Sequence, residues 1–312
     1  MKVFITGGTG NIGQFVTLAV SANGHETIVL SRNPDNYPSL AKKAMLIKGM
    51  ITDYELLADY IKDCDAVIHI AYSLGDGPVS MFNNDTAAVV NLLEISEKAG
   101  VEKFIYTSST AAIGLKRDFM DETVMDLPID LYGSTKAASE AYVLGFTKYY
   151  GTNKDISMKR NIIRPGYTYS TPPFYDGSSQ SDKRFRDIAD AIVNDKPVML
   201  TKYDGRQFIS AREVAQLYIK LLESDKNGEI YLALGNKFTT WEQVAKTAIE
   251  YYKDSKSEII LNDLGLRLEP QMYCVKKMER DFSLSFDSQN DLFEHIKWNI
   301  DESVKKRQLL LN

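Results

Sequence analysis

The sequence KVFITGGTGNIG occupies residues 2–13 and decides the fold. Residues 2–6 form a short apolar run rich in β-branched and aromatic side chains, which predicts a buried parallel strand. Residues 14–22 carry apolar side chains at helical spacing, and Asn23-Gly24 predicts the end of that helix. A strand, a glycine-rich turn and a helix in this order form the context that a dinucleotide-binding motif requires.

The glycines of this turn have a chemical purpose at a phosphate site. A side chain there would block the tight turn and keep a pyrophosphate away from the backbone N–H groups. The N-terminus of the following helix adds unpaired donors and the positive end of a dipole. The alternative is a glycine-rich loop without a ligand, which the flanking strand and helix disfavour. We therefore expect the cofactor diphosphate to be held by Gly7, Thr9, Gly10, Asn11, Ile12 and Gly13.

The choice between NAD(H) and NADP(H) is usually read at the end of the second strand, about 20 residues after the glycines. That strand is predicted at 26–30, and Ser31-Arg32-Asn33 follows it without an acidic residue. Ser31 can donate a hydrogen bond to a ribose 2′-phosphate, and Arg32 can pair with it. We therefore expect NADP(H), with NAD(H) as the alternative. The other interpretations of Arg32 are a solvated loop charge and a stack on the adenine.

The composition is that of an ordinary globular protein. The chain has 312 residues, of which 44% are hydrophobic and 25% charged, and a net charge of −5. This length suits one large domain or a domain with an additional lobe. The mild acidity gives no reason to expect nucleic acid as a partner. The chain has no apolar run near the roughly 20 residues of a membrane span, so we expect no membrane partner and a cytoplasmic protein. Two scattered cysteines and three scattered histidines predict neither a disulfide framework nor a metal site.

Short apolar runs alternate with amphipathic segments along the first half of the chain. Further strands are predicted at 44–48, 66–70, 102–107 and 161–164, and the longest helices between them at about 79–98 and 130–150. This alternation argues for an α/β protein with a Rossmann doubly wound parallel sheet that is covered on both faces. We expect the NAD(P)-binding domain at 1–165, with a strand and helix at about 207–234 returning to it. A smaller C-terminal α/β substrate lobe should occupy most of 166–312.

Ligands of open α/β sheets bind outside the carboxyl ends of the strands. Ala71, Tyr72 and Ser73 follow the strand at 66–70, so we expect the first two beside the cofactor and Ser73 at the substrate. His69 could act as a base, but its apolar neighbours make a buried core histidine the better interpretation. The long irregular segment at 167–183 is typical of a binding loop, and Tyr167 is a candidate wall of the substrate pocket.

A proton-transfer unit is predicted from Ser109, Tyr132 and Lys136. The tyrosine and lysine lie one turn apart on one face of a predicted helix, and Ser109 follows the strand at 102–107. A lysine ammonium and the positive ring of an oxidised nicotinamide would lower the pKa of the phenol, and a serine hydroxyl would orient the substrate oxygen. The Tyr-x-x-x-Lys spacing occurs at three other places, but only this one lies one helix after a strand that ends in a serine.

In their order, these motifs resemble the extended short-chain dehydrogenase/reductase family, the NAD(P)-dependent epimerase/dehydratase group. The matching segments are 6–13 for its cofactor motif, 104–114 for its serine-bearing strand end, 164–166 for its strand-six motif, and 206–209 and 231–235 for later landmarks. The resemblance implies a Rossmann domain with a bound nicotinamide cofactor.

The resemblance also implies roles for single residues. Tyr132 would be the acid/base, Lys136 would hold the ribose and tune Tyr132, and Ser109 would polarise the substrate oxygen. Tyr132, Lys136 and Pro165 would also contact the cofactor. Met50 and Ile51 stand at the family's usual adenine contact, where an acidic residue is common.

Two departures bear on the substrate. The acidic pair that sugar-nucleotide dehydratases carry beside the catalytic hydroxyl is missing after Ser109, which disfavours a dehydratase. Arg206 matches a diphosphate-binding arginine of sugar-nucleotide enzymes, but their second arginine has no clear equivalent. A nucleotide sugar is therefore one expected small-molecule substrate class.

The expected function is hydride transfer at a carbonyl/alcohol centre by a reductase or a sugar-nucleotide-epimerase-like enzyme. Ser31 and Arg32 favour a reductase, which exchanges NADP(H) in every turnover. Arg206 and the C-terminal lobe favour an epimerase, which returns the hydride and keeps its cofactor. The alternative is a non-catalytic NADP-sensing regulatory protein on the same fold. Members of the family that the sequence resembles often form dimers through two long helices. The resemblance therefore further suggests a homodimer paired through the helices at about 79–98 and 130–150.

Overall fold

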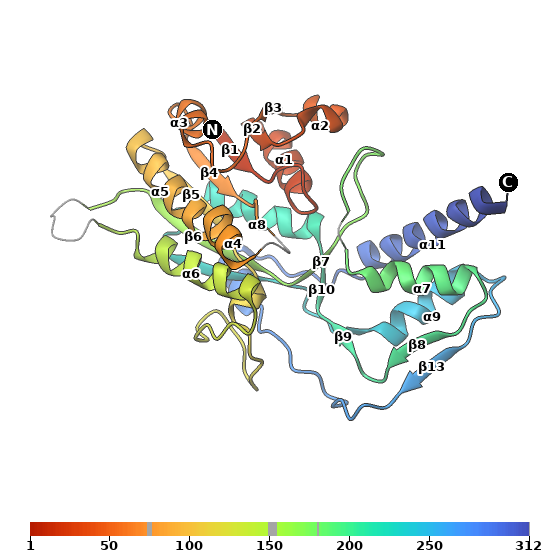
Figure 1. Ribbon diagram of the computed structural model, residues 1–312. Helices are drawn as coiled ribbons and strands as arrows, with labels where there is room; N and C mark the ends of the chain where they lie inside the picture. The colour runs from red at the N-terminus through yellow and green to blue at the C-terminus, as the bar shows by residue number, and fades with distance from the viewer. Residues whose placement is uncertain (74–76, 149–154, 180, 312) are drawn as a thin grey trace.

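A computed structural model describes residues 1–73, 77–148, 155–179 and 181–311. Seven strands form its central sheet: β1 (Lys2–Thr6), β2 (Glu26–Ser31), β3 (Met45–Lys48), β4 (Ala66–His69), β5 (Lys103–Thr107), β6 (Lys159–Pro165) and β11 (Glu229–Ala233). All neighbours pair in parallel, in the order β11-β6-β5-β4-β1-β2-β3 (Figure 1). The predicted doubly wound Rossmann sheet is confirmed, and the strand order reverses between β1 and β4, where such sheets bind ligands.

Helices cover both faces of the sheet because its strands are apolar on both sides. Val3 and Ile5 of β1 belong to a core with α1 (Gly13–Ala22) and α8 (Ala211–Glu223). Phe4, which points to the opposite face, belongs to a second core with α3 (Tyr54–Ile61) and α5 (Ala88–Ala99). Each strand is thus held between two apolar layers, and its carboxyl end stays free to meet a ligand.

The two longest predicted helices differ from expectation. The first is α4 (Pro78–Met81), then a π-helical segment η2 (Phe82–Ala87), then α5. The second, α6, covers Leu131–Gly145 and does not reach residue 150. Phe146 leaves the helical region with ψ 63° directly after Gly145, a weak helix former, and residues 149–150 lie outside the described part of the chain.

Shorter elements connect the strands of the N-terminal half. They are η1 (Pro34–Asn36) and α2 (Pro38–Ala41) after β2, and η3 (Thr110–Ala112) after β5. All three follow the carboxyl end of a strand. They therefore lie at the edge of the sheet where the site is expected.

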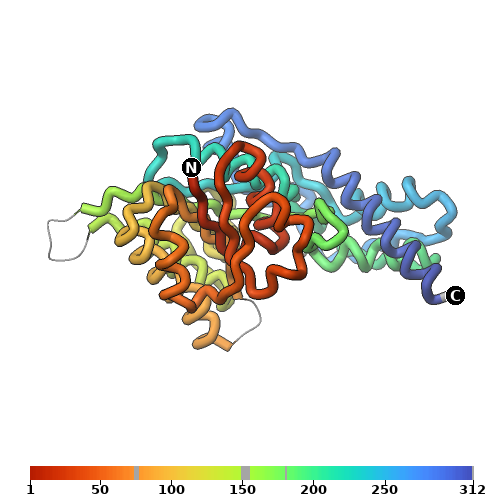
Figure 2. Tube along the Cα trace, turned by 90° about the horizontal axis from the view of Figure 1, so that it is seen from above, coloured from red at the N-terminus to blue at the C-terminus, as the bar shows by residue number. Residues whose placement is uncertain are grey.

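The rest of the chain forms small sheets and helices that extend away from the large sheet (Figures 1 and 2). Its strands pair as β7 (Tyr167–Tyr169) with β10 (Phe208–Ser210), β8 (Val198–Thr201) with β13 (Ile259–Asn262), and β9 (Gly205–Arg206) with β12 (Thr239–Thr240). Its helices are α7 (Lys183–Val193), α9 (Trp241–Tyr251) and α11 (Gln289–Leu311), whereas α10 (Lys276–Phe282) packs against β11 of the large sheet.

This second part has an aromatic core. Phe185, Phe208 and Trp241 are buried, and their ring centroids lie 5.0–5.4 Å apart. The segment expected to return to the Rossmann sheet at 207–234 is divided. Its first strand, β10, pairs with β7, whereas α8 and β11 join the large sheet. A separate substrate lobe at 166–312 stays a prediction.

None of the helices in the described ranges is long and apolar enough to cross a bilayer.

Candidate active site

A cavity of about 840 Å³ opens at the carboxyl ends of β1, β4 and β5. It brings together seventeen of the predicted site residues: Gly7, Thr9, Gly10, Asn11, Ile12, Gly13, Ser31, Arg32, Met50, Ile51, Ala71, Tyr72, Ser73, Ser109, Tyr132, Lys136 and Pro165. Tyr167 and Arg206 do not line it. Among the described residues of its wall, none is acidic and two, Arg32 and Lys136, are basic.

The glycine turn has no room for side chains. Gly7 has φ +71°, and a Cβ atom there would lie 2.5 Å from the backbone nitrogen of Ala71. A Cβ atom on Gly13 would overlap the carbonyl oxygen of Gly7. Helix α1 begins at Gly13, and no described side chain caps it at Ile12. The turn therefore leaves a helix N-terminus directed at the cavity without a competing side-chain oxygen, which fits a diphosphate.

The end of β2 forms another part of the wall. Ser31 is buried and Arg32 is exposed, and both line the cavity together with Tyr37 from the following turn. Met50 and Ile51, after β3, lie at the same cavity. The Ser31 hydroxyl and the Arg32 guanidinium could therefore bind a 2′-phosphate at this end of the cavity. None of the described wall residues carries a carboxylate that would repel it.

Two helix caps bring the proposed proton-transfer residues together. The Ser109 hydroxyl oxygen accepts a hydrogen bond of 3.1 Å from the Ala111 N–H at the start of η3. The Asp130 carboxylate accepts one of 2.7 Å from the Gly133 N–H at the start of α6. A Cβ atom on Gly133 would overlap the Ala111 carbonyl oxygen, so the missing side chain allows the two segments to touch.

Lys136 is fixed beneath three aromatic rings. Its Nζ donates a hydrogen bond of 2.9 Å to the Thr107 carbonyl oxygen at the end of β5. The same nitrogen lies 5.7 Å from the ring centroid of Tyr132, 5.6 Å from that of Tyr72 and 5.1 Å from that of Tyr106. Lys136 is 2% exposed, so its position is set by packing as well as by the hydrogen bond.

Burial dominates the ionisation of this cluster. It raises the pKa of Tyr132 to about 12, against a smaller lowering effect of a hydrogen bond with Ser109. It also lowers the pKa of Lys136 to about 8, against the attraction of Asp85 and Glu140. The expected lowering of the phenol pKa needs the positive ring of an oxidised nicotinamide as well as the lysine, so it stays a prediction. Among the chain's own groups, desolvation of the phenolate is the largest effect on the pKa of Tyr132.

Asp85 does not line the cavity itself but supports a wall residue, Ser73, and the sequence did not reveal it. It is buried on the π-helical segment η2, and its carboxylate accepts a hydrogen bond of 2.7 Å from the Ser73 N–H. It also favours the charged form of Lys136 and so raises the pKa of that lysine. No local pattern around residue 85 distinguishes it from a polar helix position.

His69 belongs to the core, as predicted. It is 1% exposed, its Nδ1 lies 2.6 Å from the Thr6 hydroxyl oxygen, and its ring stacks on Tyr106 at 5.8 Å. Burial lowers the pKa of His69 to about 3, so this imidazole stays neutral at physiological pH.

Tyr167 and Arg206 form a separate pair. The guanidinium carbon of Arg206 lies 4.6 Å from the Tyr167 ring centroid, and its Nη1 lies 2.5 Å from a carboxylate oxygen of Asp204. Burial and the nearby Arg206 both lower the pKa of Lys116. The chain thus gathers cationic groups here, but Arg206 is already engaged by a carboxylate.

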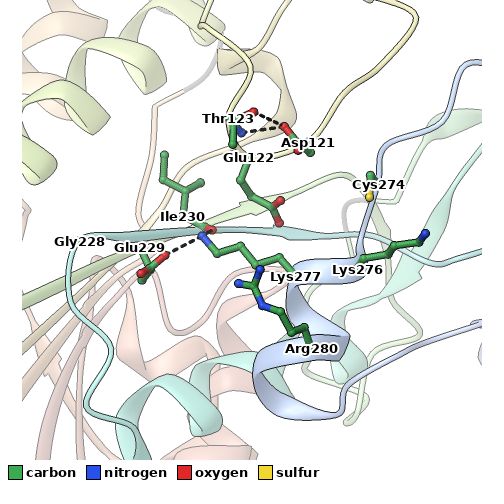
Figure 3. Close-up of a pocket in the computed structure, with 10 residues that line it drawn as sticks. All are labelled: Asp121, Glu122, Thr123, Gly228, Glu229, Ile230, Cys274, Lys276, Lys277 and Arg280. Atoms are coloured by element: carbon green, nitrogen blue, oxygen red, sulfur yellow. Dashed lines mark hydrogen bonds and ion pairs between the residues drawn. The ribbon is translucent and has the colours of Figure 1, made fainter.

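A second cavity, of about 530 Å³, lies at the outer edge strand β11 (Figure 3). The Lys277 ammonium pairs with Glu229 at 2.7 Å and donates to the Ile230 carbonyl oxygen. The Glu122 carboxylate accepts a hydrogen bond of 3.0 Å from the Leu232 N–H. These charged side chains form hydrogen bonds with the backbone of β11 at the edge of the sheet. They therefore hinder the pairing of this edge strand with a strand of another chain.

The comparisons with known proteins agree with this geometry. Residues 3–233 match the family model described as "NAD dependent epimerase/dehydratase family". A UDP-glucose 4-epimerase of Rhizobium meliloti is 24% identical over 259 residues, which cover 77% of this chain and 79% of that protein. A 3-beta-hydroxysteroid dehydrogenase of Mycolicibacterium neoaurum is 30% identical over 180 residues, covering 53% of this chain and 46% of that protein.

Solved structures also share this fold. The crystal structure of a UDP-glucuronic acid 4-epimerase from Bacillus cereus in complex with NAD superposes with a TM-score of 0.76 at 20% identity, over 95% of this chain and 96% of that one. The predicted family resemblance is confirmed, and the regulatory-protein alternative is not supported. The chain is an enzyme that belongs to the NAD-dependent epimerase/dehydratase family.

Proposed function

We propose that this enzyme moves a hydride between a nicotinamide cofactor and a carbonyl/alcohol carbon, with Tyr132 as the acid/base. One observation carries the proposal. Ser109, Tyr132 and Lys136 line the same cavity as the glycine turn, so a dinucleotide bound at the turn can reach the proton-transfer residues. A bound nicotinamide ring supplies or accepts the hydride.

The chain's own residues would manage the proton and the substrate oxygen. Tyr132 would donate its hydroxyl proton to the oxygen of a carbonyl that is being reduced, or take that proton when an alcohol is oxidised. Ser109 would hold the same oxygen by a hydrogen bond. Lys136 would hold ribose hydroxyls and keep a positive charge near the phenol. Because burial raises the pKa of Tyr132 to about 12, its phenol is protonated at neutral pH and can act as a proton donor.

We further propose NADP(H) as the preferred cofactor and NAD(H) as the alternative. Ser31 and Arg32 support this because they line the cavity where no described wall residue carries a carboxylate. A guanidinium beside a 2′-phosphate forms charge-assisted hydrogen bonds that a 2′-hydroxyl does not offer.

A nucleotide sugar is the substrate class we propose, in an epimerase-like reaction. The Rhizobium meliloti relative is named for a UDP sugar, and the Bacillus cereus structure for another. Arg206 would bind the diphosphate after exchanging its contact with Asp204. The second candidate is an NADP(H)-dependent reductase, which Arg32 favours and which the dehydrogenase name of the Mycolicibacterium neoaurum relative supports.

We also propose a homodimer that pairs through α4–α5 and α6. Val79, Phe82 and Tyr142 on these helices are 72%, 53% and 53% exposed, which is unusual for large apolar side chains. A cytoplasmic location stays a prediction.

A panel of UDP sugars tests the reaction. Purified enzyme is incubated with each sugar and with NAD or NADP, and the products are followed by proton NMR. Interconversion of two epimers with catalytic cofactor supports the epimerase, and stoichiometric consumption of NADPH with a carbonyl compound supports the reductase. An enzyme that binds neither cofactor contradicts the proposal.

A further inference from the structure

A segment distant in sequence is tied across the glycine turn. Residues 170–178, called the strap below, follow β7 and lie beside the N-terminal elements in Figure 2, where the strap is drawn in green next to red. The Gln14 side-chain amide donates to the Ser178 carbonyl oxygen, and its Oε1 accepts a hydrogen bond of 3.1 Å from the Ser178 N–H. One side chain thus satisfies both backbone groups of a residue 164 positions away.

Two further hydrogen bonds fasten the strap. The Ser170 hydroxyl donates to the Asn11 side-chain oxygen within the glycine turn. The Asp176 carboxylate accepts a hydrogen bond of 2.9 Å from the Ser39 N–H in α2. Gln14 and Ser170 are each 2% exposed, so the contacts of these two side chains are shielded from competing water, whereas Ser39 and Asp176 are half-buried.

The strap itself is a built structure. The Gly177 N–H donates a hydrogen bond of 3.0 Å to the Phe174 carbonyl oxygen, which closes a turn. A Cβ atom on Gly177 would lie 2.9 Å from both that oxygen and the Gln14 Oε1, so glycine is needed for the close approach. The turn and the Gln14 contact therefore depend on each other.

The anchor points lie at the two sides of the cofactor cavity. Asn11 lines it at the glycine turn, and Gln14 follows in the first turn of α1. Ser39 lies two residues after Tyr37, which lines the other side with Arg32. Ser178 itself is part of the wall. The strap thus joins the expected diphosphate side to the expected ribose-phosphate side.

We propose that the strap is a latch that retains the dinucleotide, with Gln14 as its positioning residue. The inference rests on the proposed function, because it needs a dinucleotide in this cavity. The cofactor leaves only after the Gln14–Ser178 contact opens, so its residence time is set by the latch and not by the cavity wall alone. A retained cofactor suits an epimerase-like cycle, in which the hydride is returned before the cofactor departs.

The experiment measures cofactor release. Wild type, Gln14→Leu and Asp176→Ala are loaded with NADPH or NADH, and dissociation is followed by stopped-flow fluorescence after mixing with excess oxidised cofactor. Gln14→Leu keeps a side chain of similar volume and removes both hydrogen bonds to Ser178. Asp176→Ala removes the hydrogen bond to Ser39 of α2, and because Asp176 is less buried than Gln14, this change disturbs the packing less. Tyr175→Ala, in the same strap, is the matched control because that side chain is 94% exposed.

We expect dissociation at least tenfold faster in Gln14→Leu, several-fold faster in Asp176→Ala, and unchanged in the control. Hydrogen exchange of residues 170–178 should slow on cofactor binding in wild type and less so in Gln14→Leu. If Gln14→Leu and Asp176→Ala fold and release the cofactor at the wild-type rate, the latch is refuted. The cofactor site is still supported in that case, provided that the wild type binds the cofactor. Absence of binding in wild type refutes the proposed function itself, and the latch with it.

Discussion

The Nζ of Lys136 donates a 2.9 Å hydrogen bond to the carbonyl oxygen of Thr107, which ties the middle of α6 to the end of β5. This contact holds a cation at the carboxyl edge of the sheet, next to the residues that would handle the proton. Burial disfavours that charge and lowers the pKa of Lys136 to about 8, so the ammonium is present at neutral pH but is lost in mildly alkaline solution.

Cofactor affinity should therefore weaken as pH rises through about 8. Below that pH the ammonium is already formed, whereas above it binding must first take up a proton, so the dissociation constant rises with pH. Calorimetric titration between pH 6.5 and 9.5 measures this. Lys136→Met should bind more weakly and lose the pH dependence.

Lys62→Met is the control for that experiment, because Lys62 has a 62% exposed side chain and lies outside the cavity wall. The control should keep the wild-type profile. A Lys136→Met profile that still changes near pH 8 would show that another group is responsible.

Cofactor preference should depend on Arg32. In Arg32→Asp the carboxylate repels a 2′-phosphate and can accept a hydrogen bond from a 2′-hydroxyl. Loss of one charge-assisted contact, about 1.5–3 kcal/mol, corresponds to roughly 10- to 100-fold weaker binding of NADP(H). NAD(H) binding should stay equal or improve.

Separate titrations with NADPH and NADH give both constants for the wild type and the variant. An Arg32→Asp variant that keeps its NADPH affinity would place Arg32 in solvent and remove the argument for NADP(H).

A buried ion pair should couple β6 to α6. Arg164 and Glu140 are each 2% exposed and share two hydrogen bonds, of 2.8 Å and 2.5 Å. Arg164→Met leaves the buried Glu140 carboxylate without its cation and should lower the free energy of unfolding by about 3–5 kcal/mol. Glu140→Leu should cost less, because Arg164 keeps its ion pair with Asp126. The double variant should recover most of this loss, because two apolar side chains replace the pair.

Urea unfolding followed by circular dichroism measures the four free energies. Additive losses in the double variant would mean that the two side chains act independently. Asp126, which lies 2.7 Å from Arg164 but is more exposed, stays unchanged in all four proteins.

Much of the fold could be predicted because its signals are local. The apolar runs that became β1 to β6 and the glycines of the first turn are readable over a few residues. Helix α11 is readable in the same way, because Leu292, Ile296 and Ile300 form a helical stripe that is buried in the aromatic core with Phe185, Phe208 and Trp241.

The site was predictable where a residue type is dictated by backbone geometry or by a motif, as at Gly13 or Tyr132. Partners that depend on tertiary packing were not. Arg206 was expected at the substrate, but only the folded chain shows that Asp204 and Tyr167 already engage it. The contact between Gln14 and Ser178 spans 164 residues and has no local signature.

The most direct test of the central claim is Tyr132→Phe, assayed for cofactor affinity and for turnover of the substrate that the UDP-sugar panel identifies. The account predicts a cofactor affinity that is largely intact and a turnover number lower by about 10²- to 10⁴-fold, because the variant removes the phenolic hydroxyl and with it the transferable proton. Turnover equal to that of the wild type would contradict the assignment of Tyr132 as the acid/base.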